Sequence, residues 1–245
     1  MASDPVHKEL LPITGSANRL LRMLGEDEYR ALMPKLRRVR LAARQVVGQP
    51  GAAADSVYFP CGCVLSVLTM MADGTMVETG TVGREGFAGA DVLLGGERWN
   101  DTVVCQVEGD CVCLSAEDFA GAVAGDTGLR RATQRFLITY LGLVAQSAAC
   151  NRLHKVEERF ARWMLMICDR VGGEAFYLTQ EYIAQMLGVQ RPSVSTVASA
   201  FQHAGLIRYA RGRVTILDRH GLEQASCECY AVRARQIEEL LRPPA

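Results

Sequence analysis

The segment from Leu178 to Ile216 constrains the fold of this chain more than any other. It reads LTQEYIAQMLGVQRPSVSTVASAFQHAGLIRYARGRVTI. Apolar residues recur at helical spacing up to Gly188, and a second helical pattern follows Pro192. Two short helices joined by a glycine turn and followed by a small hairpin form a winged helix-turn-helix, a fold that places one helix in the DNA major groove.

Capping and turn residues mark the ends of both predicted helices. Thr179 is a natural N-cap, because its hydroxyl can accept a hydrogen bond from a free backbone N–H of the first turn. Gly188 stands where the first helix must turn sharply, a place that favours positive φ. Pro192 suits the first turn of the second helix, where its missing N–H is not needed. We expect the buried face of that helix to consist of Val194, Val197, Ala198 and Phe201.

The other positions of this segment are expected to face outward. Arg191, near the start of the second helix, can bond to guanine O6 and N7 with both arms of its guanidinium, a contact worth about 1–3 kcal/mol of discrimination. Arg211 and Arg213, at the tip of the predicted wing, would contact phosphates and hold the register. The candidate DNA-binding residues are Thr179, Gln180, Gln190, Arg191, Ser193, Ser195, Thr196, Ser199, Arg211 and Arg213.

Positive charge is concentrated in this module. Between Val189 and Arg219 five arginines stand against one aspartate, an excess of four positive charges, whereas the formal net charge of the whole chain is zero. A basic patch confined to one small module is typical of DNA binding. Two other interpretations stay open: an ordinary helical hairpin with a solvated polar surface, and a winged helix that binds protein instead of DNA.

Length and composition limit the number of domains and the cellular location that we expect for this chain. The 245 residues fit one large domain or two ordinary ones, and 49% hydrophobic residues suffice for packed cores. The N-terminal sequence MASDPVHKELL carries charges where a signal peptide needs an apolar core. The longest uncharged runs, Ser56–Ala72 and Phe136–Asn151, are shorter than the roughly 20 apolar residues of a membrane helix. We therefore expect a cytoplasmic protein without membrane contact.

The pattern changes along the first half of the chain. The first fifteen residues resemble an irregular arm, and apolar spacing predicts helices over Ser16–Met23 and Asp27–Leu36. From about Arg37 to Leu114, short β-rich runs alternate with turn signals, which is typical of a β-sandwich or barrel. The clearest hairpin turns at Asp73-Gly74.

A long helix is predicted to follow, ending near Leu153. Its stripe recurs at intervals of three and four: Leu129, Ala132, Phe136, Tyr140, Leu143, Ser147 and Cys150. Two interpretations fit. Either the helix packs on the core of its own domain, or the stripe is a parallel dimerisation seam while Leu137, Leu141 and Val144 pack on the barrel. A second amphipathic helix is expected over Lys155–Val171.

From about Leu20 to Leu222 the chain resembles the Crp/Fnr superfamily of bacterial transcription regulators. IAQMLGVQRPSVSTVASAFQHAGLI carries the resemblance most specifically, and SVYFPCGCVLSVL, ADGTMVETGTVGREGFAG and NRLHKVEERFARWML resemble barrel and hinge segments. The resemblance implies an α+β fold with a jelly-roll barrel of the cyclic-nucleotide-binding type, a long dimer helix and a C-terminal winged helix-turn-helix. We place the barrel at 16–125, the dimerisation helix at 126–153, the DNA-binding domain at 154–225 and a helical tail at 226–245.

The same resemblance implies a non-enzymatic, homodimeric regulator that binds two half-sites in promoter DNA and responds to a signal sensed in the barrel. RNA polymerase is a further candidate partner, and the effector stays open. The alternative function is an interaction module whose barrel binds a nucleotide or a protein and whose winged helix does not read DNA. The best-known members present Arg, Glu and a second Arg on the recognition helix. This chain keeps the first as Arg191 but has Pro192 and Thr196 at the other two positions. Its operator should therefore differ from theirs.

The nucleotide contacts of the family are altered as well. Cyclic-AMP-binding members have a Glu for the ribose after a glycine-rich turn and then an Arg-Ser pair for the phosphate. Here Ala90 follows Gly89, and Asp101-Thr102 stands about where Arg-Ser belongs. An acidic residue there would repel a phosphate, and Arg98 could replace the missing arginine only after a loop shift. We expect a signal other than cyclic AMP, with Gly89, Ala90, Arg98 and Thr102 as candidate ligand contacts.

The nine cysteines include three Cys-x-Cys pairs, at 61 and 63, 111 and 113, and 227 and 229. Such pairs could bind metal or sense oxidants, whereas most buried cysteines act as small apolar residues. Cys61 and Cys63, at a turn, are the better thiol candidates, and Cys227 and Cys229 could be exposed after the wing. The four histidines lack metal-ligand spacing. We predict no metal, no cofactor and no catalytic residue, and keep a thiol-based redox sensor as an alternative.

Overall fold

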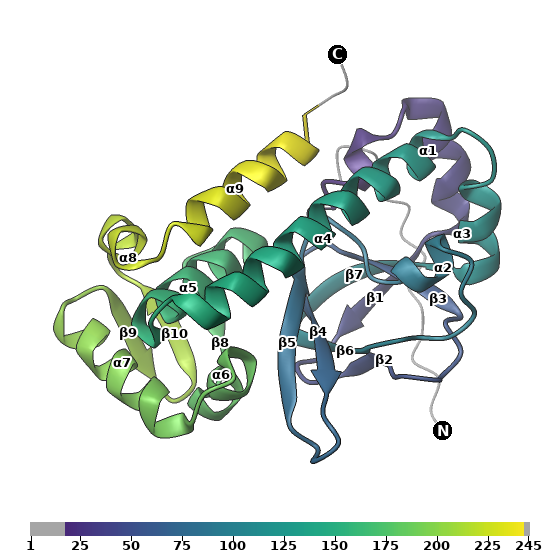
Figure 1. The fold of residues 1–245 in the computed structure, drawn as a ribbon. Coiled ribbons are helices and arrows are strands. Elements are labelled where there is room, and N and C mark those ends of the chain that lie inside the picture. The colour runs from purple at the N-terminus through teal and green to yellow at the C-terminus, as the bar shows by residue number, and fades with distance from the viewer. Residues whose placement is uncertain (1–17, 243–245) are drawn as a thin grey trace.

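The computed structural model describes residues 18–242, so the expected N-terminal arm lies outside the described residues. Figure 1 shows a β-rich N-terminal half, a long helix across the front and a mostly helical C-terminal half. The strands are β1 (Arg37–Leu41), β2 (Val46–Gly48), β3 (Ser56–Pro60), β4 (Val64–Met70), β5 (Met76–Val82), β6 (Thr102–Val107), β7 (Gly109–Ser115), β8 (Ala175–Tyr177), β9 (Ile207–Ala210) and β10 (Arg213–Ile216). The helices are α1 (Glu26–Leu32), α2 (Ala90–Leu93), α3 (Ala116–Ala122), α4 (Gly128–Leu153), α5 (Val156–Val171), α6 (Gln180–Leu187), α7 (Arg191–His203), α8 (Arg219–Ala225) and α9 (Cys229–Leu240).

The N-terminal half is built from two antiparallel sheets. Their strand orders are β1-β7-β3 and β2-β6-β4-β5, and side chains from both sheets share one core. The predicted hairpin is present between β4 and β5, where Gly74 has a φ of 85° and Asp73 Oδ1 accepts a hydrogen bond from Thr75 N. The helix expected over Asp27–Leu36 is shorter than predicted, because the chain tightens at Met33–Lys35 into a 3₁₀ turn that contains a proline.

A column of aromatic rings joins the barrel to α4. The ring of Phe87 lies 5.9 Å from that of Phe59 and 5.4 Å from that of Phe136, which is followed by Tyr140 at 5.7 Å. These separations suit favourable edge-to-face or offset ring packing. Position 86 must be glycine, because a Cβ there would overlap the Phe136 ring. The long helix is therefore part of the barrel core along its N-terminal half.

The apolar stripe of α4 faces its own chain. Leu129, Ala132, Phe136, Leu143 and Cys150 are all buried within the monomer, so the interpretation of the stripe as a dimerisation seam is wrong. The prediction that Leu141 packs on the barrel is also wrong, since its side chain is 61% exposed. Periodicity identifies an apolar stripe but does not say what covers it.

No helix among residues 18–242, α4 included, is long and apolar enough to cross a membrane.

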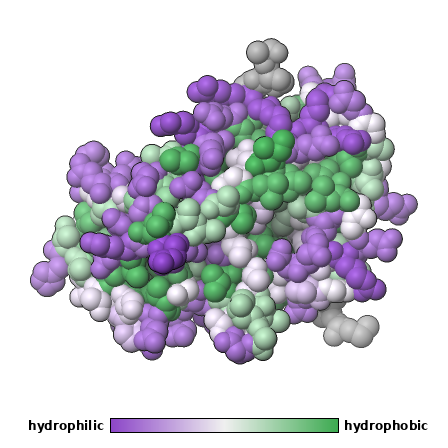
Figure 2. Space-filling view, viewed as in Figure 1, coloured by the Kyte–Doolittle hydropathy of each residue, from purple (hydrophilic) through white to green (hydrophobic). Residues whose placement is uncertain are grey.

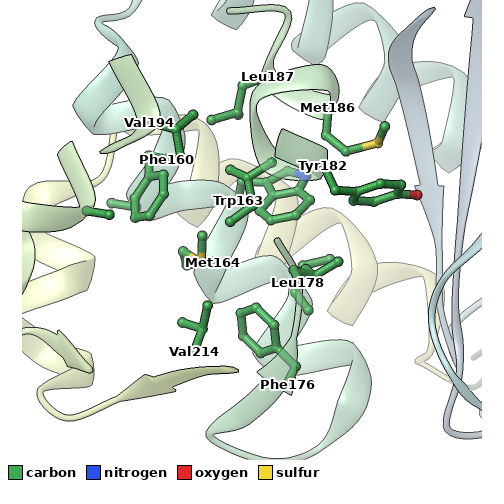
Figure 3. Close-up of a cluster of buried hydrophobic side chains, with 14 of the residues drawn as sticks. Phe160, Trp163, Met164, Phe176, Leu178, Tyr182, Met186, Leu187, Val194 and Val214 are labelled. Atoms are coloured by element: carbon green, nitrogen blue, oxygen red, sulfur yellow. The ribbon is translucent and has the colours of Figure 1, made fainter. Parts of the chain in front are cut away.

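The C-terminal half has a second core centred on α5. Figure 3 shows Phe160, Trp163 and Met164 of α5 surrounded by side chains of α6, α7 and the wing strands. Tyr182, on α6, points toward the strands of the barrel (Figure 3). Apolar residues on β4 and β6 belong to the same buried cluster: Val64, Leu68, Val104 and Val107. The two halves are therefore packed together over a continuous apolar contact.

Two carboxylates, buried Glu85 and half-buried Glu78, bind α5 at this contact. Glu85, in the loop after β5, receives a hydrogen bond from Arg170 Nε of α5 at 2.9 Å, and both side chains are about 95% buried. Glu78 of β5 accepts hydrogen bonds from Trp163 Nε1 at 3.0 Å and from Ser66 and Thr81 hydroxyls. Because a buried charge needs its partner, these bonds hold α5 at a defined place on the barrel.

We expect Arg170→Met to lower the free energy of unfolding by about 3–5 kcal/mol, because the variant leaves the Glu85 carboxylate buried without its partner. Urea denaturation followed by circular dichroism measures the change. Arg30→Met is the control, since Arg30 makes only exposed ion pairs with Glu26 and Asp27, and its effect should stay below about 1 kcal/mol. Equal losses in the two variants would contradict the role assigned to the buried pair.

Candidate nucleic-acid interface

The α6–turn–α7 geometry follows from a few local residues. Thr179 Oγ1 accepts a hydrogen bond from Tyr182 N at 3.2 Å and so caps α6. Gly188 ends α6 with a φ of 64°, and its N–H bonds back to α6 carbonyls. α7 then begins at Arg191 with Pro192 in its first turn. The cap, the turn and the start of the second helix are where the sequence predicts them.

α7 buries one face and exposes the other. Val194, Val197, Ala198 and Phe201 are buried, as predicted. Of the predicted DNA-binding residues, the half-buried ones are Gln180 and Ser195, and the exposed ones are Thr179, Gln190, Arg191, Ser193, Thr196, Ser199, Arg211 and Arg213. Ser195 Oγ donates to Gln180 Oε1 at 2.6 Å, so this pair braces α7 against the start of α6.

A surface groove brings the two ends of the predicted interface together. It is lined by Arg44, Thr179, Gln180, Glu181, Arg191, Tyr209, Arg211 and Gly212. The N-terminus of α7 and the tip of the wing thus open onto one concave surface. Arg191 Nε lies 4.0 Å from Glu181 Oε2, and both side chains are mostly exposed. An exposed pair of this kind is weak, which leaves the Arg191 guanidinium available to an anionic partner.

Arg44 is a groove residue that sequence reasoning missed. It lies in the turn between β1 and β2, and its Nη2 donates to Thr179 Oγ1 at 3.4 Å across 135 sequence positions. Its guanidinium also lies 6.0 Å from the centre of the Tyr182 ring, within the range of a cation–π contact. No local pattern in the sequence signals such a long-range contact.

The wing presents both arginines of its predicted tip at the surface. Arg211 and Gly212 both have positive φ, 50° and 79°, which forms the tight turn between β9 and β10. Arg211 and Arg213 are exposed there. Arg219, which contributes to the local positive charge of the sequence, instead bonds to Asp169 at 2.6 Å and to Glu223 at 3.0 Å. Its charge is neutralised within the fold.

Each candidate ligand contact in the barrel has a structural role or is buried. Gly89 begins α2 with a φ of 115°, close against Val57, and Ala90 is half-buried in the first turn of this helix. Arg98 Nη1 donates to the carbonyl of Gly51, and Thr102 is buried in β6. Burial, with the nearby charge of Asp91 adding to it, raises the pKa of Asp101. This environment suits a phosphate poorly.

The structure changes the interpretation of the cysteines. Burial raises the pKa of Cys61 to about 11, so this thiol is protonated at neutral pH, and Cys63 is fully buried. Cys227 and Cys229 are 5% and 0% exposed. The expectation that these two could be exposed is wrong, because the link between α8 and α9 folds under the end of α4.

Four residues with metal-ligating atoms meet at that place. Cys150 and His154, at the end of α4, lie beside Cys227 and Cys229, and their ligand atoms are all within 4.8 Å of one another. The hydrogen bond shared with Cys227 lowers the pKa of Cys150. These are residues that can hold a metal ion. Sequence spacing does not reveal them, because Cys150 and Cys227 lie 77 positions apart.

Two known domain families match the chain. The cyclic nucleotide-binding domain matches residues 38–126, and the Crp-like helix-turn-helix domain matches residues 158–225. No curated protein matches the sequence.

Solved structures of regulators share the fold. TTHB099, a transcriptional regulator of the CRP family from Thermus thermophilus, is 23% identical with a TM-score of 0.65, over 77% of this chain and 96% of that chain. FixK2 from Bradyrhizobium japonicum is 14% identical with a TM-score of 0.65, over 78% and 96%. CLP, a c-di-GMP responsive global regulator from Xanthomonas campestris, is 16% identical with a TM-score of 0.59, over 78% and 99%.

We expect Gly188→Ala to lower the free energy of unfolding by about 1–2 kcal/mol, because alanine is strained at a φ of 64°. A Cβ at this position meets Val77 only at ordinary contact distance, so the cost comes from the backbone. Gly173→Ala is the control, since its Cβ meets no described atom within 4 Å, and its effect should stay within about 0.5 kcal/mol. Thermal denaturation of the two variants measures the difference, and an unchanged Gly188→Ala protein would contradict this account.

Proposed function

Because this chain belongs to the Crp/Fnr superfamily, with a cyclic nucleotide-binding domain and a Crp-like helix-turn-helix domain, we propose that it is a homodimeric transcription regulator that binds promoter DNA in a sequence-specific way. The observation that carries the proposal is the groove in which Thr179, Arg191 and Arg211 meet. It joins the start of a recognition helix, the cap of the preceding helix and a basic wing on one exposed surface. A protein with these features acts in the cytoplasm, where the chromosome of a bacterium lies.

Different residues of the interface are proposed to have different roles. Arg191 contacts base edges, because it stands at the N-terminal end of α7 where recognition helices reach bases. Ser193, Thr196 and Ser199 lie on the exposed face of α7 and allow its close approach to the groove floor. Arg211, at the wing tip, contacts phosphates and fixes the register without carrying sequence information.

The operator is proposed to differ from that of the best-known family members. Pro192 offers no donor to a base, and the hydroxyl of Thr196 donates to the Pro192 carbonyl at 3.0 Å within α7. Only Arg191 then remains of the three residues that those members present. Fewer base contacts in each half-site leave more of the sequence discrimination to DNA shape.

Dimerisation is proposed to use the exposed face of α4. Ile138 and Leu141 are 72% and 61% exposed, and exposed Ala145 and Ala148 continue the series at intervals of three and four. This is the spacing of a helix-pairing seam. Figure 2 shows apolar side chains along the part of the surface where α4 crosses the front of the molecule. A second copy of the chain, packed along this face, would bury them and place two helix-turn-helix units side by side.

The barrel is proposed to pass its signal to DNA through the contact between the two halves. Arg44 of the barrel lines the groove, and α6 packs against β5. A shift of the barrel relative to α5 therefore changes the shape and charge of the groove, as allosteric control requires. The acidic pair Asp91 and Asp101 supports a signal other than cyclic AMP. A redox sensor based on Cys61 has less support, because its thiol is protonated at neutral pH.

We expect Arg191→Ala to relax sequence preference at one position of each half-site by about 1–3 kcal/mol, whereas Arg211→Ala should weaken binding to all duplexes and reduce the salt slope by about one. Operators selected from random duplexes, followed by fluorescence anisotropy at several salt concentrations, measure both effects. Arg22→Ala is the control, because Arg22 is exposed and comes shortly before α1, which lies at the opposite end of the molecule from α7 (Figure 1). Absence of duplex binding by the unaltered protein at low salt would refute the proposed function.

For the dimer, we expect Leu141→Asp to raise the dissociation constant by at least about tenfold, since association would bury a charge. Analytical ultracentrifugation over a range of protein concentrations measures it. Leu217→Asp is the matched control, because Leu217 is also an exposed leucine, 51% accessible, but lies at the end of the wing. If both variants dissociate to the same extent, or the unaltered chain is monomeric at high concentration, α4 is not the dimer interface.

A further inference from the structure

The cluster of Cys150, His154, Cys227 and Cys229 lies outside the proposed DNA interface and has no role in it. Cys150 is in the last turn of α4, and His154 is the residue that follows this helix. Cys227 lies in the link between α8 and α9, and Cys229 is the first residue of α9. The three cysteines form a small buried cluster of their own, apart from both large cores. Nothing in apolar packing requires four such residues to converge there.

Two of the six ligand–ligand distances in the cluster match tetrahedral coordination of one ion, and all six are within 4.8 Å. Cys150 Sγ lies 3.6 Å from Cys227 Sγ, and Cys229 Sγ lies 3.6 Å from His154 Nδ1. A tetrahedral zinc ion with Zn–S bonds of about 2.3 Å and a Zn–N bond of about 2.05 Å separates its ligands by roughly 3.6–3.8 Å. An iron–sulfur cluster spreads its ligands over several metal ions and needs more room.

The surrounding polar groups have the arrangement typical of a metal site. The other ring nitrogen of His154, Nε2, lies 3.1 Å from the carboxylate of Glu228, which fixes Nδ1 as the nitrogen that faces the cysteines. This is the carboxylate–histidine–metal arrangement that orients an imidazole ligand. Gln146 Nε2 donates to Cys229 Sγ at 3.0 Å, a contact that stabilises a thiolate.

The charge around the cluster also favours a negatively charged complex. Three thiolates, one neutral imidazole and Zn²⁺ carry one net negative charge. Arg159, Arg162 and Arg233 are at least 93% buried, and each interacts electrostatically with this cluster or with its neighbours. Within residues 18–242, none of the three guanidiniums forms an ion pair with an acidic side chain. A buried anionic complex would compensate part of their charge.

We propose that Cys150, His154, Cys227 and Cys229 form a structural Zn²⁺ site that joins the end of α4 to the start of α9. Three sulfurs and one nitrogen in a buried, closed set are the donors that structural zinc sites use. Bound there, the ion links the long helix, the hinge into α5 and the C-terminal helix at a single point. It holds the winged helix-turn-helix in a defined orientation on α4 whether or not DNA is bound.

The first test measures metal in the full-length protein, purified under reducing conditions and dialysed against buffer that contains Zn²⁺. We expect about one zinc per chain by inductively coupled plasma mass spectrometry and about a tenfold lower content in Cys150→Ala and Cys229→Ala. Cys168→Ala is the matched control, because Cys168 is also buried but lies outside the cluster, and it should keep its zinc. Equal zinc in Cys150→Ala and in the unaltered protein would overturn the proposal.

A second test does not depend on whether these variants fold. Co²⁺ added to the zinc-free unaltered protein should give the sulfur-to-cobalt charge-transfer and d–d absorption of a tetrahedral thiolate site. Glu228→Gln, which keeps all four ligands, should weaken zinc affinity about 10–100-fold in competition with a chromophoric chelator. If the reduced protein takes up neither metal and, after oxidation, contains a disulfide between Cys150 and Cys227, the cluster is a thiol pair and the proposal is wrong.

Discussion

The buried ion pair between Glu85 and Arg170 determines how the two halves of the molecule sit together. Removal of either group from water costs several kcal/mol, so the pair is stable only while the barrel and α5 stay in contact. α5 in turn supports α6, α7 and the wing, as Figure 3 shows. The place of the recognition helix relative to the barrel therefore depends on two side chains that lie far from the DNA surface.

The control of the winged helix that we propose for the barrel would act through this arrangement. The polar contacts at Glu78 and Glu85 are directional, whereas the apolar contact around Trp163 is not. In the proposed control, a small change in the barrel would alter these hydrogen bonds while the apolar surfaces stay covered. Two arrangements of similar energy are the physical requirement for a switch.

Local signals in the sequence predict local structure well here. The Thr179 cap, the Gly188 turn and the Asp73-Gly74 hairpin each depend on residues within a few positions, and all three are present. Long-range features escape the same reasoning. Three such features depend on segments that lie far apart in the chain: the covered face of α4, the contact of Arg44 with Thr179 and the approach of Cys150 to Cys227. Neither periodicity nor residue spacing indicates which distant segment packs against a given helix or turn.

The return of α9 along α4 affects how this chain folds during synthesis. Leu240, near the end of α9, is buried in the same core as Leu20 and Leu21, and Arg135 of α4 donates to its carbonyl at 2.7 Å. Arg19 also pairs with Glu238. The barrel is encoded first, but part of its core arrives last. The part of the barrel core that Leu240 covers therefore stays open until α9 has been synthesised and packs along α4.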